Sequence, residues 1–344
     1  MERIKVGVVG TGKLGRLHAL RYKEIAAADL VGVYDVDGAR MKAVAAEAGC
    51  RAFPDLTRLL DQVDAVNVVV PTTHHFAVAR EALRRKKHVF IEKPITTTLE
   101  EADELIRLAR HHRRIIQVGH IERFNQAMRA VQAIELHPGF IESHRLAMFD
   151  PRGTDVAVVL DLMIHDIDII LSLVKSPVQH IDANGVAVIS DEPDIANARL
   201  TFANGCVANV TASRISQKKM RKMRLFQKDA YVSIDFLQGI SERYRLVQEL
   251  PTAEASNRAS GPQSGIVMGK LEGKHTRYIV YERLQAPEGN ALKMELEAFV
   301  RAIQTGKAPE VGAEDGRKAL EVASKISEII KRQELADGHP RTGI

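Results

Sequence analysis

A regular alternation of short β-branched runs with helical patterns fills roughly the first 120 residues and limits the possible folds more than any other feature. The runs are almost continuously apolar, and the helical patterns between them are roughly 10–15 residues long. Such strands lie in a parallel sheet that helices cover on both faces, an α/β arrangement. The expected strands are Ile4–Val9, Leu30–Tyr34, Ala65–Val70, His88–Ile91 and Ile115–Val118, and the helices between them are Leu14–Ile25, Gly38–Ala48, Phe76–Arg84 and Leu99–His111.

The pattern changes after about residue 122, where longer alternating strands predict a largely antiparallel sheet flanked by helices, an α+β domain. We therefore divide the chain into residues 1–122 and residues 123–344. Pro251–Gly273 is polar and rich in Gly, Ser and Pro, and is expected to be a long loop. The expected helices are Phe124–Ile134, Leu160–Val174, Lys293–Gln304 and Asp315–Ala336, and the strands are Ile141–Met148, Val178–Val188, Asn197–Thr201, Val207–Arg214, Arg221–Phe226 and Ala230–Asp235.

Composition excludes several classes of protein. No run approaches the roughly 18 apolar residues of a membrane helix, and a strand at Ile4–Val9 leaves no room for a signal peptide. Cys50 and Cys206 are the two cysteines, too few for a disulfide framework or a zinc site, which favours the reducing cytoplasm. The net charge is +5, but aromatic residues are 5% and Trp is absent. These values favour an anionic small molecule over nucleic acid as the partner.

A G-x-G-x-x-G sequence follows the first strand and opens the first helix. In this context Gly10 permits the tight turn, Gly12 lets a pyrophosphate approach the backbone, and Gly15 lets helix and strand pack closely. Asp35 comes 20 residues after Gly15, at the end of the second strand, where an acid binds the adenine ribose and repels a 2′-phosphate. The alternatives are a Gly-rich turn and an ordinary N-cap at Asp35. The set predicts NAD, with NADP possible because Arg40 lies nearby; the loop residues are Gly10, Thr11, Gly12, Lys13, Leu14 and Gly15.

Two further motifs follow the third and fourth strands. They are P-x-x-x-H, from Pro71 through Thr72 to His75, and Glu92-Lys93-Pro94. Both lie at carboxyl ends of parallel strands, where an open sheet places its ligand crevice, so Pro71, Thr72, His75, Glu92 and Lys93 are expected at the cofactor.

The ordered set, from G-x-G-x-x-G-x-x-H (through His18) to Asp161-x-x-x-His165, resembles the glucose–fructose oxidoreductase/inositol dehydrogenase/rhizopine-catabolism (Gfo/Idh/MocA) family. The resemblance implies a Rossmann domain, NAD(P) as cofactor, a C-terminal domain for substrate binding and oligomerisation, and a homodimer or homotetramer. It also implies that Lys93 lies near the nicotinamide and the reacting carbon. Asp161 and His165 would reach the same point from the second domain.

The chemistry of these side chains agrees with the roles that the resemblance implies. Oxidising a secondary alcohol needs a base for the hydroxyl proton, which a His such as His165 supplies near neutral pH. The Lys93 ammonium would stabilise the developing alkoxide. Asp161 lies four residues before His165, on one face of the expected helix, and would orient its ring. Pro94 restricts Lys93 to extended geometry.

Simpler interpretations of these residues stay open. Lys93 is also compatible with a solvated strand end, and His165 with a core position among Met163, Ile164, Ile167 and Ile170. Asp166 and Asp168 are expected to be capping or interface residues. We expect no metal at His74 and His75, because adjacent side chains point in different directions.

Two positions depart from the family pattern. Lys86 stands where the family has a glycine that suits a left-handed helix end, so a different cap is expected there. Val156–Leu160 replaces a Gly-rich stretch before the Asp-x-x-x-His helix, which puts the shape of the substrate pocket in doubt.

The segments His120–Asn125 and Asp161–Asp168 look like the subgroup that oxidises the 3-hydroxyl of UDP-N-acetylglucosamine. The resemblance makes His120, Arg123 and Asn125 candidates for substrate binding. Arg214 opens a run of cations through Lys228 that would suit a diphosphate, or form a solvated basic face. The alternatives for function are a dehydrogenase of a free polyol such as inositol and a non-catalytic cofactor-binding regulator.

Overall fold

The computed structural model describes residues 2–150, 156–249, 265–272 and 276–336. The chain forms two compact units, and neither is continuous in sequence. The first contains Met1–Phe124 and Gly289–Glu321, and the second contains Asn125–Glu288 and Val322–Ile344. The first crossing lies close to the division made from the sequence at residue 122. The return of the chain to the first unit differs from that single division.

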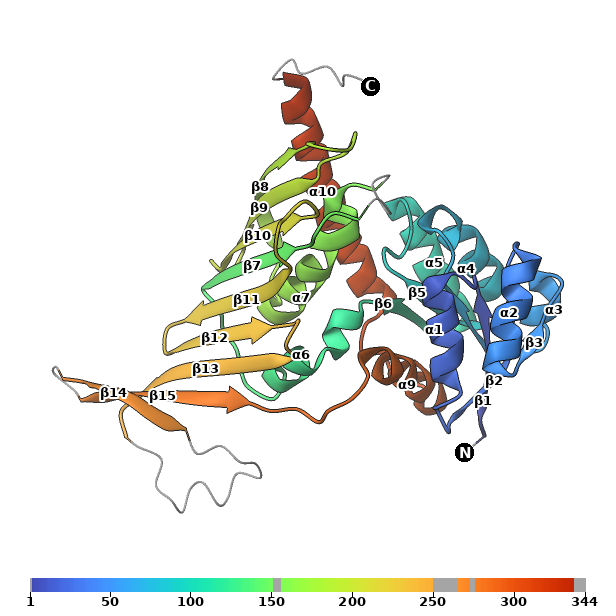
Figure 1. The fold of residues 1–344 in the computed structure, drawn as a ribbon, viewed down its shortest axis with the longest axis horizontal. Helices are drawn as coiled ribbons and strands as arrows, with labels where there is room; N and C mark the ends of the chain where they lie inside the picture. Colours follow the sequence, from blue (N-terminus) through green and yellow to red (C-terminus); the bar gives the residue numbers. More distant parts are fainter. Residues whose placement is uncertain (1, 151–155, 250–264, 273–275, 337–344) are drawn as a thin grey trace. The chain divides into compact units, whose positions relative to one another are not determined.

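The first unit is built on a six-stranded parallel sheet in the order β3-β2-β1-β4-β5-β6 (Figure 1). The order reverses between β1 and β4, which is the switch point of a doubly wound sheet. The expected α/β fold class is therefore confirmed for this unit. The strands are β1 (Ile4–Val9), β2 (Ala28–Tyr34), β3 (Arg51–Ala52), β4 (Ala65–Val68), β5 (His88–Glu92) and β6 (Ile116–Gly119).

Helices cover both faces of this sheet. One face carries α1, α2 and α9 around a common core with β1 and β2. Right-handed crossovers that run in the other direction from the switch point put α4 and α5 on the opposite face. The helices are α1 (Lys13–Tyr22), α2 (Gly38–Ala48), α3 (Leu56–Leu60), α4 (His75–Arg84), α5 (Leu99–His112) and α9 (Ala291–Thr305), with short 3₁₀ turns η1 (Thr72–His74) and η2 (Ile121–Phe124).

The α9 helix belongs to the first unit because its apolar side chains complete that core. Leu292, Leu296, Phe299 and Val300 are buried among residues of β1, α1 and α2. Phe299 also meets Phe90 edge to face at 5.9 Å.

The second unit is built on a nine-stranded sheet in the order β14-β15-β13-β12-β11-β7-β10-β9-β8. All neighbours pair antiparallel except β7 and β10, so the expected α+β class is confirmed. The strands are β7 (Phe140–Leu146), β8 (Val178–Val186), β9 (Ile195–Phe202), β10 (Val207–Ser213), β11 (Met220–Gln227), β12 (Ala230–Asp235), β13 (Ile240–Val247), β14 (Ile266–Leu271) and β15 (Arg277–Leu284), and the helical segments are α6 (Gln126–Val131), η3 (Val159–Met163), α7 (Ile164–Val174) and α10 (Ala313–Ala336), which passes from the first unit into this one.

Helices α6 and α7 pack on one face of this sheet (Figure 1). On the other face, aromatic rings form a ladder across neighbouring strands, with successive ring centroids 5.1–5.8 Å apart. The strands alternate, so a residue beside each ring in sequence points to the helices, and beside four of the five rings such a residue is buried, namely Ile141, Leu225, Val232 and Val280. The ladder consists of Phe140, Phe226, Tyr231, Tyr244 and Tyr281.

Two expectations about this unit need correction. Strands β13 and β15 were not expected, and part of the expected loop at Pro251–Gly273 is strand β14, with the rest largely outside the described residues. The expected single helix at Leu160–Val174 begins instead with a π-helical turn, η3, and α7 starts only at Ile164.

The end of α4 corrects the expectation of a different cap at Lys86. Lys86 has φ 58, so it adopts the left-handed conformation without being glycine. Its N–H donates to Leu83 O at 2.8 Å, and the N–H of Lys87 donates to Ala82 O at 2.9 Å, which is a Schellman motif. Arg113 and Lys175 end α5 and α7 in the same conformation. All three are basic, and a cation near a helix C-terminus is favourable by about 0.3–1 kcal/mol.

We predict that Lys86→Gly stabilises the protein by about 0.5–1 kcal/mol. A side chain in the left-handed region costs roughly 1–2 kcal/mol, which exceeds the lost interaction with the helix dipole. Urea unfolding followed by circular dichroism measures the change. Lys86→Ala is the control, because it removes the charge but keeps the β-carbon, and it should give no gain. A loss of stability in the glycine variant would contradict the strain argument.

Candidate functional site

In the first unit, the predicted cofactor residues follow the carboxyl ends of parallel strands. Because the strands are parallel, these ends lie at one edge of the sheet, on both sides of the switch point between β1 and β4. The residues at this edge are Gly10 after β1, Asp35 after β2, Pro71 and Thr72 after β4, Glu92 and Lys93 at β5, and His120 after β6.

The loop between β1 and α1 has the geometry that a pyrophosphate needs. Gly10 has φ +91, and a β-carbon there would lie 2.3 Å from Val69 O. At Gly15 a β-carbon would lie 1.9 Å from Gly10 O, whereas at Gly12 it would meet nothing within 4 Å. Gly12 is the N-cap of α1 and gives no side-chain cap, so the first amides of the helix face open space. Such an N-terminus binds phosphates through N–H donors and the helix dipole.

Asp35 is buried at the end of β2 and is surrounded by donors. Its carboxylate accepts the N–H of Thr11 at 2.5 Å, the hydroxyl of Thr11 at 2.9 Å and the N–H of Asp37 at 2.9 Å. Arg40 Nη2 lies 3.0 Å away. Burial raises the pKa of Asp35, but these hydrogen bonds together hold it below its ordinary value. Asp37, and not Asp35, caps α2, so the simple N-cap interpretation of Asp35 does not apply.

His75 contacts the backbone of the chain after β4 and of the chain after β5. Its Nδ1 lies 2.8 Å from Pro94 O and its Nε2 lies 2.9 Å from Val70 O, and the side chain is buried. Burial lowers the pKa of His75, whereas the two carbonyls favour the protonated ring. A neutral ring has one N–H, so it donates to one of these carbonyls. His75 therefore ties the turn after β4 to the Lys93–Pro94 turn after β5.

Lys93 stands at the tip of β5, partly buried, and a cis peptide bond joins it to Pro94. Its N–H donates to the Glu92 carboxylate at 3.3 Å. The Glu92 side chain is 13% exposed. Glu92 and Lys93 therefore present one carboxylate and one ammonium at the same strand end.

In the second unit, Asp161 and His165 belong to different helical segments. Asp161 lies in the π-helical turn η3 and His165 in the first turn of α7, so the expected common face of one α-helix is not the geometry found. Irregular turns of this kind are frequent at functional sites. Met163, Ile164, Ile167 and Ile170 are fully buried, whereas His165 is only partly buried, which argues against the core interpretation.

Asp166, next to His165, has a structural environment. Arg145 Nε lies 2.6 Å from its carboxylate, and the hydroxyl of Ser143 donates to it at 3.0 Å, with all three side chains buried. Removing one member of a buried ion pair costs about 3–5 kcal/mol. Asp166 therefore fixes α7 to β7 and is not available to a ligand.

Arg214 is buried, and its guanidinium lies against a backbone carbonyl and a carboxylate. Its Nη2 donates to Val156 O, and its Nε lies 3.7 Å from the buried Asp194. Elsewhere in the predicted cation run, Lys222 pairs with Asp235 at 3.1 Å and Arg224 with Glu142 at 2.9 Å. The run therefore contains a buried cation beside Asp194 as well as cations nearer the surface that pair with carboxylates.

The residues after β6 have different environments. His120, which precedes η2, is buried. Arg123 lies within η2 and is partly buried. Asn125 caps α6, because its Oδ1 accepts the N–H of Ala127 at 3.0 Å while its Nδ2 donates to Phe236 O at 3.0 Å. The Asn125 amide therefore caps α6 through its oxygen and bonds the chain after β12 through its nitrogen.

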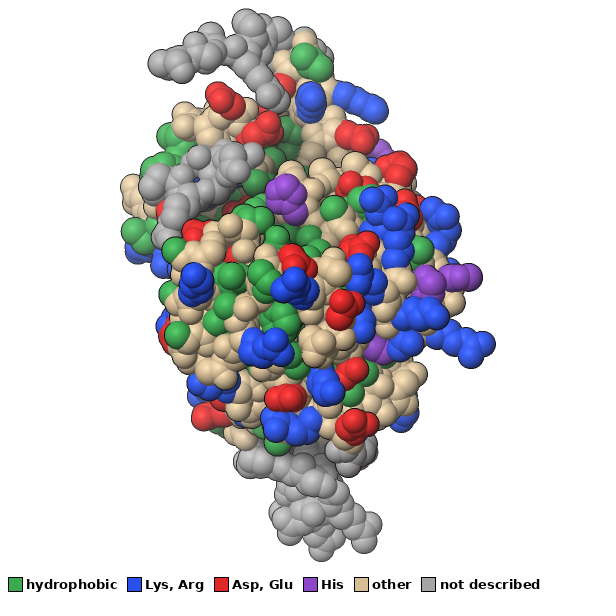
Figure 2. All heavy atoms as spheres, turned by 90° about the vertical axis from the view of Figure 1, so that its right-hand side faces the viewer, with side chains coloured by type: hydrophobic (Ala, Val, Ile, Leu, Met, Phe, Trp, Pro, Cys, Tyr) green, Lys and Arg blue, Asp and Glu red, His purple; other side chains and the backbone are tan. Residues whose placement is uncertain are grey.

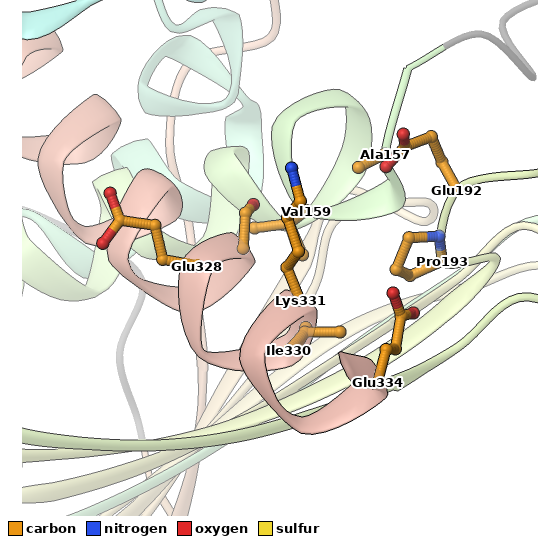
Figure 3. A pocket seen from close by; sticks show the side chains of 9 residues that line it. Ala157, Val159, Glu192, Pro193, Glu328, Ile330, Lys331 and Glu334 are labelled. Carbon is orange, nitrogen blue, oxygen red and sulfur yellow. The ribbon is translucent and has the colours of Figure 1, made fainter. Parts of the chain in front are cut away.

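A hollow of roughly 220 Å³ in the second unit contains none of the predicted site residues. Figure 3 shows it between α10, which contributes Glu328, Lys331 and Glu334, and the chain at Ala157 and Val159, with Glu192 and Pro193 at one end. Its lining is mostly acidic or apolar, which does not suit an anionic ligand.

The face drawn in Figure 2 carries Lys and Arg side chains interspersed with Asp and Glu. Among the described residues, no group of three or more His, Cys, Asp or Glu side chains gathers where it would hold a metal ion. Within the same residues, no helix has the length and apolar character to cross a membrane.

Reasoning from the sequence gave no role to Tyr22, Asn67 and Gly119, and used His18 only as part of a motif. All four lie close to Glu92 or are linked to it through hydrogen bonds. Asn67 was the available signal, since it is one polar residue within the otherwise apolar run AVNVVV.

Comparison with family models and known proteins gives concordant results. Residues 4–120 match the model of an oxidoreductase family with an NAD-binding Rossmann fold, and residues 127–232 match the GFO/IDH/MocA C-terminal domain. The chain is 38% identical over 327 residues to UDP-N-acetylglucosamine 3-dehydrogenase of Acidithiobacillus ferrooxidans, covering 95% of this chain and 97% of that protein.

Two solved structures and one further relative are also similar to this chain. The structure of the same Acidithiobacillus enzyme has a TM-score of 0.84 and 36% identity, covering 96% of this chain and 99% of the other. Myo-inositol 2-dehydrogenase of Thermotoga maritima is 24% identical, covering 92% and 93% of the two chains. Scyllo-inositol dehydrogenase of Lactobacillus casei, solved with NAD(H) and scyllo-inositol, has a TM-score of 0.75 at 21% identity over 96% and 98%, which shows a common fold.

We predict that His75→Leu destabilises the protein by about 1–3 kcal/mol, because it removes the donor of one of the carbonyls of Val70 and Pro94. The matched control is His74→Leu, since His74 is the preceding residue and its side chain is exposed. Urea unfolding of both variants at neutral pH gives the comparison. Equal stability of the two variants would show that the bridge between the loops contributes nothing.

Proposed function

This chain belongs to the Gfo/Idh/MocA family of oxidoreductases, and on that premise we propose that it oxidises the 3-hydroxyl of UDP-N-acetylglucosamine to a ketone. The observation that carries the proposal is the 38% identity to an enzyme of that name over nearly the full length of both chains. The inositol dehydrogenase of Thermotoga maritima is 24% identical over a similar length.

The cofactor fits the residues at the sheet edge. The open backbone at Gly12 and the uncapped amides of α1 would hold the pyrophosphate, and Asp35 would accept the ribose hydroxyls. When bound, the nicotinamide supplies the hydride acceptor. Family membership and these contacts support a nicotinamide cofactor, and we propose NAD over NADP because Asp35 is held ionised at the ribose position.

Protein side chains would manage the proton and the developing charge. We propose that His165 takes the proton from the sugar hydroxyl, since its ring is partly exposed and an imidazole is the usual side-chain base near neutral pH. The Lys93 ammonium would stabilise the alkoxide as hydride departs. Asp161, in the π-helical turn before α7, would orient the imidazole.

The proposal also covers the location and the assembly of the protein. Cys50 and Cys206 are both free, and burial raises the pKa of each thiol to about 11, in keeping with a reducing cytoplasm. The homodimer or homotetramer that the resemblance implies stays a prediction, as do His120 and Arg123 as substrate contacts.

The test of function is a trapped oxidation assay. Alcohol oxidation by NAD is unfavourable near neutral pH, so an aminotransferase or a carbonyl trap must consume the ketone. Mass spectrometry should show the UDP-sugar ketone as its amine or as its adduct with the trap, with no reaction of inositol or free glucose. Turnover of a free polyol without binding of UDP-sugars would refute the proposal in favour of a polyol dehydrogenase, and no turnover at all would favour a regulator.

In the same assay, Lys93→Ala and His165→Ala should each lower turnover by about two orders of magnitude. The matched control is His180→Ala in the second unit, because His180 is exposed and pairs with Asp182 at 3.0 Å. Near-normal turnover of the His165 variant across pH would assign the base to another residue.

The cofactor preference has its own test. Wild-type protein should bind NADH more tightly than NADPH, and Asp35→Ala should raise the NADPH-to-NADH affinity ratio by about tenfold or more, since it removes the repelling carboxylate and frees Arg40. Fluorescence titration of both cofactors measures the ratio. Asp37→Ala is the control, since it removes the cap of α2 and keeps Asp35. Tighter binding of NADPH to the wild-type protein would contradict the proposal.

A further inference from the structure

A chain of buried polar side chains runs from α1 through β4 to the strand end that carries Lys93. The hydroxyl of Tyr22 donates to Asn67 Oδ1 at 2.7 Å. Asn67 Nδ2 lies 2.9 Å from His18 Nδ1, and His18 Nε2 lies 3.1 Å from Glu92 Oε1. Tyr22, Asn67 and His18 are all essentially inaccessible to solvent, so water does not replace these contacts.

The order of donors fixes the tautomer of His18. Because Asn67 Oδ1 accepts from Tyr22, the Asn67 amide group that faces His18 is its NH₂, a donor. His18 Nδ1 must then be the acceptor, and the ring proton of a neutral imidazole lies on Nε2, facing Glu92. Phe90 packs edge to face on the His18 ring at 5.4 Å and limits its rotation.

The Glu92 carboxylate is confined from the other side as well. Gly119 pairs with Glu92 in the register of β5 and β6, and a β-carbon at Gly119 would lie 2.8 Å from the carboxylate atoms. The third contact of the carboxylate is the N–H of Lys93 at 3.3 Å. Glu92 therefore lies in a slot formed by His18, the bare backbone of Gly119 and the first peptide of the Lys93–Pro94 turn.

We propose that His18 is a positioning residue, which acts through Glu92 to hold the Lys93 turn in the geometry required for reaction. The relay of Tyr22 and Asn67 keeps the His18 proton on Nε2, the ring nitrogen that lies 3.1 Å from the Glu92 carboxylate. The role of Lys93 in this inference rests on the proposed function, whereas the tautomer of His18 does not.

The tautomer is tested on the wild-type protein without substrate. Two-bond ¹H–¹⁵N correlation spectra of protein labelled at histidine nitrogens, with His18→Gln for assignment, should show a neutral His18 protonated on Nε2. A proton on Nδ1, or an imidazolium at neutral pH, would overturn the relay. This result stands even if the wild-type protein fails to oxidise a UDP-sugar, so failure of the relay and failure of the proposed function are separable.

The positioning role is tested by kinetics. His18→Leu removes the donor and should lower kcat by about tenfold to a hundredfold, with KM and NADH affinity changed by much less, because a misplaced catalytic turn affects the reaction more than binding. His18→Gln keeps an amide donor near the Nε2 position and should recover much of the lost kcat. A kcat of His18→Leu equal to that of the wild-type protein would refute the role.

A second pair of variants keeps the test informative if His18→Leu fails to fold. Gly119→Ala places a methyl group against the Glu92 carboxylate and leaves His18 intact, and it should lower kcat in the same way. The matched control is Gly7→Ala on β1 of the same sheet, where the new β-carbon also meets an atom at 2.8 Å, but that atom belongs to the Leu59 side chain. An equal kcat in the two alanine variants would show that the position of Glu92 does not matter.

Discussion

The close approach of α1 to the loop that precedes it is the contact on which the site of the first unit depends. A β-carbon at Gly15 would lie 1.9 Å from Gly10 O, so only a glycine allows the helix to lie so near the sheet. The buried face of α1 consists of Gly15, His18, Ala19 and Tyr22, which follow the helical spacing of three and four residues. The same approach that presents the helix N-terminus to a phosphate therefore also brings His18 and Tyr22 onto Asn67 and Glu92.

Two buried histidines from opposite faces of the sheet hold the edge where the motifs meet. His18 comes from α1 and reaches the Glu92 carboxylate, and His75 comes from α4 and joins the carbonyls of Val70 and Pro94. Leaving a buried polar group without its partner costs about 1–3 kcal/mol, so the contacts of each ring favour the position that it has. Lys93 follows Glu92 and precedes Pro94 in the sequence, so both of these contacts are made by its immediate neighbours. Its mobility is thus limited by groups that need not touch any ligand.

Much of the first unit could be predicted because its strands are buried on both faces and read as apolar runs; β1 was predicted with the bounds that the structure has. Strands β13 and β15 were missed because they carry charges on the face toward the helices, such as Arg243 and Arg245, which both pair with Glu282 across strands, and aromatic rings on the other face. Because of these charged pairs, the two strands lack the alternation of apolar and polar residues by which a strand is predicted from sequence. Nor does an amphipathic pattern say which core it fills, so the return of α9 to the first unit was not predictable.

Residue type at the site was easier to predict than residue role. His75 and Asn125 were both expected at a ligand, and the structure gives each a structural contact as well, since the first bridges two loops and the second caps a helix. The cation run is similar. Breaking the buried pair of Arg214 with Asp194 would cost several kcal/mol, whereas the exposed pairs of Lys222 and Arg224 contribute at most about 1 kcal/mol and exchange partners readily. Arg214 thus lies beside a carboxylate that already orders the turn at Val188–Ser190, because Asp194 accepts the three amides of that turn.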